Sequence, residues 1–137
     1  MRITRAVDLQ ILDDILIGRG GFGHRQHLEL AWQYLQRYPL EEASSAMVVA
    51  IQHVARRHGA ERKYHETMTR AWLHFVAVHD QRWPADSFDQ FLERNPDLLD
   101  RDLIGHFYSR DLILSDRARL AWIDPDRRRL PALAQAS

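Results

Sequence analysis

A chain of 137 residues, 45% hydrophobic and 28% charged, has the size and composition of one globular domain rather than of a disordered segment. Nineteen basic residues balance nineteen acidic ones, which argues against a protein that is drawn to nucleic acid or to an anionic membrane surface. Cysteine is absent, which excludes disulfides and thiolate chemistry and leaves only nitrogen and oxygen ligands for any transition metal.

The N-terminal segment 1–21 is predicted to be an extension, partly helical, that precedes the main domain. Its apolar stretch 11–17 is split by Asp13 and Asp14, so that it has the pattern of neither a secretory signal nor a membrane span. The glycines that follow indicate a hinge, because they lack the preceding strand, the lysine and the hydroxyl residue of a phosphate-binding loop. We therefore expect a cytoplasmic protein with no membrane partner.

Three long helices are predicted from apolar residues that recur at helical spacing. The first two cover 24–38 and 41–58, and a proline or a glycine follows each of them. The third begins near Arg62, places Trp72 on its inner face and ends before Trp83. We expect this third helix to cross the centre of the core.

Shorter helices are expected in the second half of the chain. Ser87, with Gln90 three residues later, has the pattern of a capping box. Asn95 as N-cap and Pro96 at the first helical position are expected to open a further helix, and Ser115 to cap the last one. The buried side of the helix after Asn95 is expected to consist of Leu98, Leu99, Leu103 and Phe107.

Together these patterns predict an all-α fold, a compact single-domain bundle of about five to six helices. The helical domain is expected to span 22–131. A C-terminal tail over 132–137 follows it and is either loose or docked through Leu130 and Leu133.

Eight histidines are a high count for this length, and without cysteine they are the natural nitrogen ligands for a transition metal. His24 and His27 stand three residues apart at the start of a helix, so that both rings project from nearly one face. His65 is the natural third ligand of a zinc, iron, nickel or manganese ion. Hydrogen-bonded core histidines are the alternative, and His74, opposite the apolar stripe, is expected to be exposed.

Glu66 follows His65 directly and is the candidate catalytic group, as a general base or as a hydrogen-bond partner of a metal ligand. Arg62 and Arg70 flank it at four-residue spacing, so that ordinary surface ion pairing explains it equally well. Lys63 is the only lysine of the chain. Its amine can pair with a substrate carboxylate, although an exposed lysine near a helix start is the commoner outcome and the one we favour.

Two motifs resemble an uncharacterised family of small bacterial all-helical proteins. They are Phe-x-His-x-x-His-Leu-x-x-Ala-Trp, from Phe22 to Trp32, and Lys-Tyr-His-Glu-Thr, from Lys63 to Thr67. The resemblance covers roughly 22–131 and implies that one site contains His24, His27, His65 and Glu66, with Lys63, Tyr64 and Tyr108 nearby. We assign Lys63, Tyr64 and Tyr108 to substrate binding. Trp32 is added as an aromatic wall, although a core position explains it more simply.

Two functions follow from the same residues. In the first, the histidines bind a metal in a small-molecule site, and the protein is a binding protein or a metal-dependent enzyme whose metal-bound water reacts. In the second, the histidines form the polar core of a non-catalytic helical module, whose apolar helix faces bind a partner or a second copy of the chain.

Overall fold

The computed structural model describes residues 11–12 and 23–134, and every regular element within them is a helix. The long helices are α2 (His24–Arg37), α3 (Leu40–Arg57) and α4 (Glu66–Arg82). The short ones are α5 (Phe88–Arg94), α6 (Arg110–Ile113) and α7 (Asp116–Leu120), with the 3₁₀-helices η1 (Glu61–Lys63), η2 (Pro96–Leu99) and η3 (Arg101–His106). The predicted all-α, compact single-domain fold is confirmed.

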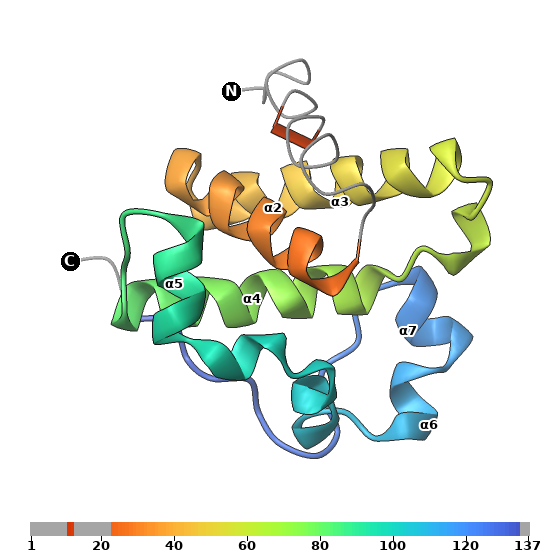
Figure 1. The fold of residues 1–137 in the computed structure, drawn as a ribbon. Coiled ribbons are helices and arrows are strands. Elements are labelled where there is room, and N and C mark those ends of the chain that lie inside the picture. The colour runs from red at the N-terminus through yellow and green to blue at the C-terminus, as the bar shows by residue number, and fades with distance from the viewer. Residues whose placement is uncertain (1–10, 13–22, 135–137) are drawn as a thin grey trace.

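Helix α4 runs through the middle of the molecule, with α2 and α3 packed along one side of it and α7 near its N-terminal end (Figure 1). Buried side chains occur around most of its circumference: Thr67, Thr69, Ala71, Trp72, Leu73, Phe75, Val76, Ala77 and Val78. A helix that is apolar on most sides belongs inside a core. The prediction that this helix crosses the core centre is confirmed.

The predicted N-terminal extension is described at two positions. Ile11 and Leu12 are helical and buried, and they belong to the same hydrophobic cluster as the long helices. The rest of the extension, with Gly18, Gly20 and Gly21 of the predicted glycine hinge, lies outside the described residues. So do the last three residues of the predicted tail. The fourth glycine of that hinge, Gly23, is the N-cap of α2.

The start of α4 differs from the helix predicted to begin near Arg62. After η1 the chain leaves the helical conformation at Tyr64 and His65, and α4 begins at Glu66. His65 is the N-cap of α4, because its Nδ1 atom accepts a hydrogen bond from the Met68 backbone N–H at 3.0 Å. The residues that usually cap helices are Ser, Thr, Asp and Asn, so that the sequence did not reveal this boundary.

The helix predicted to open at Asn95 is replaced by η2 and η3. Pro96 does occupy the start of η2, but the Asn95 side chain does not cap it. Instead, the buried Nδ2 atom of Asn95 donates a hydrogen bond to the Phe91 carbonyl oxygen at 2.9 Å. Leu99, predicted to be buried, is 46% exposed, because η2 ends at this residue after a single turn and only Leu98 of that turn is buried.

The predicted serine caps are confirmed. Ser87 Oγ accepts a hydrogen bond from the Gln90 N–H at the start of α5, and Ser115 Oγ accepts one from the Ala118 N–H at the start of α7. Ser109, which the sequence analysis had not used as a cap, does the same for α6. Short polar side chains thus set the N-terminal boundaries of three short helices.

Beyond α7 the chain returns along α4 as a segment without helical structure, residues 121–134, which we call the strap (Figure 1). Near the start of α4, the Ile123 N–H donates to Thr67 Oγ1 at 3.1 Å. Near its end, the Ala134 N–H donates to Gln81 Oε1 at 2.8 Å. The strap therefore runs parallel to α4, from its start to its end.

His74 lies beneath the strap, so that the prediction of an exposed His74 was wrong. Its Nε2 atom makes a hydrogen bond with the Pro131 carbonyl oxygen at 2.6 Å, and Leu130 packs against the core nearby. The strap has no periodic pattern, and periodicity was the signal from which exposure had been predicted. None of the described helices combines the length and the apolar composition that a membrane crossing requires.

Candidate functional site

A pocket of about 540 Å³ lies between the first turn of α2, the second half of α3, the start of α4 and η3. Its volume is within the range of small-molecule binding sites. It is lined by Gly23, His24, His27, Ile51, Val54, Ala55, Ala60, Lys63, Tyr64, His65, Met68, Thr69, Trp72, Arg101 and Ile104. We call it the His24 pocket.

The pocket gathers most of the residues that the sequence analysis singled out. Its walls include His24, His27, Lys63, Tyr64 and His65, which come from α2 and from the segment before α4. Glu66 lies next to the pocket and is hydrogen-bonded to Tyr64. Trp32 and Tyr108 lie elsewhere in the fold.

Trp32 and Tyr108 are packed in the interior away from the pocket. The Trp32 ring lies 6.2 Å from the rings of both Phe88 and Phe91. Tyr108 is fully buried, and its hydroxyl donates to the Ile123 carbonyl oxygen of the strap at 2.6 Å. Burial, assisted by neighbouring aspartates, raises the pKa of Tyr108 to about 12, so that its phenol is neutral near pH 7.

Both ring nitrogens of His65 are engaged within the protein. Its Nδ1 atom accepts from the Met68 N–H, and its Nε2 atom bonds the Ile113 carbonyl oxygen of α6 at 2.6 Å. This pattern requires a neutral ring that carries its proton on Nε2. The ring therefore caps α4 and holds α6 against its start, and it keeps no lone pair for another ligand.

His24, the first residue of α2, is held in place by two contacts. Its Nε2 atom bonds the Leu98 carbonyl oxygen at 2.8 Å, and its ring meets the Trp72 ring edge to face, with centroids 4.5 Å apart. Burial lowers the pKa of His24, and the positive charge of Arg101 lowers it further, while the Leu98 carbonyl and the Asp100 carboxylate act in the opposite direction. The ring is thus held neutral beside the pocket.

His27 is the most strongly shifted histidine of the described chain. Burial, with a smaller contribution from His24, lowers its pKa to about 4, and its Nε2 atom is inaccessible to solvent. The loss of hydration disfavours the charged form of a buried imidazole. Two adjacent neutral imidazoles therefore form one wall of the pocket near pH 7.

The three predicted metal ligands do not fit a shared ion as they lie. His65 would have to give up two hydrogen bonds before it could offer a ring nitrogen. Within residues 11–12 and 23–134, no three His, Asp or Glu side chains are grouped so that they could hold a metal. The zinc, iron, nickel or manganese centre remains a prediction, and we derive no chemistry from it.

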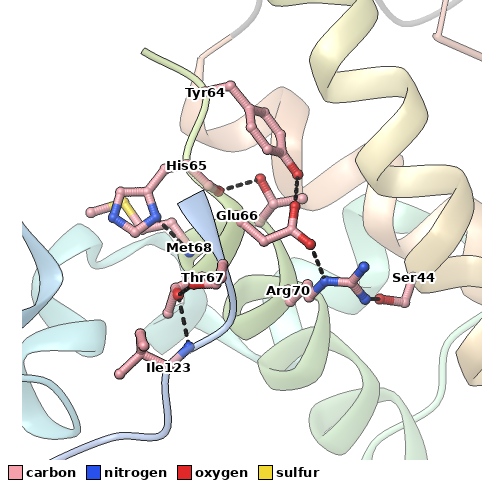
Figure 2. Close-up of polar contacts among 10 residues, drawn as sticks. Ser44, Tyr64, His65, Glu66, Thr67, Met68, Arg70 and Ile123 are labelled. Carbon is pink, nitrogen blue, oxygen red and sulfur yellow. Dashed lines mark hydrogen bonds and ion pairs between the residues drawn. The ribbon is translucent and has the colours of Figure 1, made fainter. Parts of the chain in front are cut away.

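Glu66 connects the pocket wall to α3 (Figure 2). The Tyr64 hydroxyl donates to its Oε1 atom at 2.6 Å, and the Arg70 Nε atom donates to its Oε2 atom at 2.6 Å. Arg70 in turn donates to Ser44 Oγ at 2.9 Å. Burial alone would raise the pKa of Glu66, but the hydrogen bonds from Tyr64 and Arg70 outweigh it and lower the pKa. With both oxygens engaged, the carboxylate positions Tyr64, and the predicted ion pair with Arg70 is confirmed.

Arg101 is a residue of the pocket that the sequence analysis missed. It begins η3 and lines the pocket together with Lys63 of η1, although 38 positions separate the two in the sequence. Arg101 belongs to no motif, and only the packing of η3 against the start of α2 brings it to the site. No sequence signal would have found it.

Comparison of the chain with family models, with curated proteins and with solved structures finds no match. The resemblance to a family of small bacterial helical proteins therefore stays a prediction.

Proposed function

We propose that the protein binds a small organic molecule in the His24 pocket. The observation that carries this proposal is the convergence of α2, α3, η1, α4 and η3 on one hollow of about 540 Å³. Its apolar lining comes from Ile51, Val54, Met68, Trp72 and Ile104, and polar groups stand at a few positions around it. Small-molecule sites are typically concave, largely apolar and supplied with a few convergent polar groups.

The histidines support this function by fixing the walls of the pocket. His24 ties α2 to the Leu98 carbonyl oxygen of η2, and His65 ties the start of α4 to the Ile113 carbonyl oxygen of α6. A site whose walls are held before the ligand arrives loses less entropy on binding. The same histidines can therefore form a hydrogen-bonded polar core and the walls of a small-molecule pocket, so that the two hypotheses are compatible at this point.

We assign binding rather than a reaction to this site. Glu66, the predicted catalytic group, has both carboxylate oxygens committed to Tyr64 and Arg70. The ring of His65 is committed in the same way, to Met68 and Ile113. A general base needs a lone pair that faces the substrate. The His65 ring has none left, and Glu66, whose pKa its two partners lower, is not among the residues that line the pocket.

A variant that fills the pocket tests the proposal. Ala55 lines the pocket from α3, so that Ala55→Phe occupies the space a ligand would need, and Ala60→Phe fills it from the segment before η1. Ala132→Phe, at an exposed position of the strap, is the matched control. Neutral and charged aromatic fragments would be screened against each protein by ligand-observed NMR.

We expect fragments to bind the wild type and the Ala132→Phe variant and to lose binding in whichever pocket-filling variant keeps a cooperative melting transition. Fragments that bind the filled and unfilled proteins equally would show that they bind elsewhere. A wild type that binds no fragment would contradict the proposal as well.

A further inference from the structure

The charged residues that line the His24 pocket are all basic. Lys63 and Arg101 belong to its lining, and no Asp or Glu does. We propose that the ligand of this pocket is a small organic anion, with its carboxylate or phosphate group between Lys63 and Arg101 and its apolar body over Trp72. This inference rests on the proposed function, because it names the class of molecule that the same pocket binds.

Neither cation has its charge used elsewhere in the described part of the chain. Among residues 23–134, the side chains of Lys63 and Arg101 make no ion pair and no hydrogen bond. Arg101 stands between Asp100 and Asp102 in the sequence, and Glu61 is two residues from Lys63, but none of these acids forms an ion pair with either cation. The Asp100 carboxylate instead accepts a hydrogen bond from the Asp102 N–H at the start of η3. Two unneutralised cations at the edge of a hollow favour an anionic group at that place.

The other polar groups of the pocket add no negative charge. His24 and His27 are neutral because burial lowers their pKa values, and the charge of Arg101 is close enough to His24 to contribute to that shift. The first turn of α2, whose Gly23 and His24 line the pocket, contains no acidic residue. The positive end of the α2 dipole is therefore left uncompensated by its own sequence, which favours an anion further.

The apolar part of the pocket indicates the rest of the ligand. Trp72 is only 6% exposed, and it lines the pocket together with Met68 and Ile104. Such a surface takes an aromatic or aliphatic body and excludes water from it. An inorganic anion would leave this surface bare, so that we infer an organic anion rather than free phosphate or sulfate.

Three probes with the same benzyl body distinguish the effect of charge: phenylacetate, benzylphosphonate and phenylacetamide. Phenylacetamide is neutral and has nearly the shape of phenylacetate. Their dissociation constants would be measured by NMR titration for the wild type, Lys63→Gln, Arg101→Gln and Arg62→Gln. Arg62 is the matched control, because it is exposed, adjacent to Lys63 and outside the pocket, and its replacement changes the net charge equally. The melting temperature of each variant shows whether its fold is retained.

We expect the wild type to bind at least one of the two anions about tenfold more tightly than phenylacetamide, as one charge-assisted contact predicts. Lys63→Gln and Arg101→Gln should each reduce this preference, and Arg62→Gln should keep it. The carboxylate and the phosphonate arms tell which anionic group fits better.

Equal binding of the amide and the anions would overturn the anion inference while leaving the pocket as a small-molecule site. An equal loss of preference in Arg62→Gln would overturn it too, because net charge rather than the pocket would then be responsible. If fragments bind the pocket but none of the three probes does, the anion inference fails alone. If no fragment binds the wild type at all, the proposed function fails with it.

Discussion

Polar side chains on the strap side of α4 are hydrogen-bonded within the protein, whereas the cationic side chains on the pocket side are not. On the strap side, Thr67, His74 and Tyr108 each make a hydrogen bond with a backbone group of residues 121–131. On the pocket side, Lys63 and Arg101 line a hollow and make no such bond to the described residues. The polar groups beneath the strap are thus satisfied within the protein, whereas the charged groups of the pocket are available to a ligand.

The difference indicates which polar residues serve the fold and which serve a ligand. A buried polar group that is satisfied within the protein contributes to stability, and its loss leaves a partner unsatisfied. A charged group at the rim of a pocket contributes little to stability, because solvent screens it. Mutations on the strap side should therefore change stability, and mutations at the rim should change binding.

The largest effect is expected at Trp72, which belongs both to the core and to the pocket. Trp72→Ala removes a buried ring that contacts His24 and Phe75, so that we expect a loss of about 3 to 5 kcal/mol in the free energy of unfolding. Trp83→Ala is the control, because Trp83 is 58% exposed and should lose less than about 1 kcal/mol. Urea denaturation of both variants measures the difference, and equal losses would show that Trp72 is not packed as described.

The next effect is the pH dependence that His27 imposes on the pocket side. Its pKa is about 4 in the folded protein and 6.5 in a model peptide, so that unfolding takes up a proton below pH 6.5. The stability from this group is fully present above pH 6.5 and declines by about 1.4 kcal/mol per pH unit, about 3 kcal/mol in total by pH 4.

Urea denaturation between pH 7 and about pH 5 separates this effect from the titration of ordinary carboxyl groups, which lies lower. In His27→Gln, about one proton fewer is taken up on unfolding, so the free energy of unfolding should depend less steeply on pH, whatever the effect of the substitution at pH 7. An unchanged slope in His27→Gln would show that the ring is not held neutral.

On the strap side, Thr67 should show the cost of two lost hydrogen bonds. Its hydroxyl donates to the Ala121 carbonyl oxygen at 2.8 Å and accepts from the Ile123 N–H. Thr67→Val keeps the shape and should lose about 1 to 3 kcal/mol of stability, while fragment binding in the pocket is retained. Thr67→Ser keeps the hydroxyl and should lose less, and the opposite order would count against the described strap contacts.

His74 should give the smallest effect on stability. His74→Ala removes the hydrogen bond to the Pro131 carbonyl oxygen, which water can partly replace at a half-buried position, so that we expect a loss of about 1 kcal/mol. The exposed His106 is the control, and His106→Ala should be close to neutral in a thermal melt. A His74→Ala variant that loses fragment binding would place His74 in the site and weaken the contrast between the two regions.

Periodicity and caps predicted the parts of the fold that local sequence determines. Helices α2 and α3 agree with the predicted ranges 24–38 and 41–58 to within one residue at each end, because apolar spacing and helix stops define them. The start of α4 was missed because a histidine ring, bonded to a distant carbonyl of α6, caps it. Docking through Leu130 was one of the two expected alternatives and is observed, but the path of the rest of the strap was missed because it depends on single long-range hydrogen bonds.

The site was predictable in part for the same reason. The spacing of His24 and His27, and the run from Lys63 to His65, mark residues that do line one pocket. The hydrogen bond between the His65 ring and the Ile113 carbonyl oxygen depends on how α6 packs. The position of Arg101 in the pocket depends on how η3 packs. Tertiary contacts of this kind leave no local pattern in a single sequence.

The most direct test of the pocket as the ligand site is an NMR titration of ¹⁵N-labelled protein with phenylacetate. We predict that the largest changes in backbone amide chemical shift fall within 23–27 and 63–72, which contain most of the polar pocket lining, and that the strap changes little. Changes concentrated in residues 121–134, with none around the His24 pocket, would contradict the account.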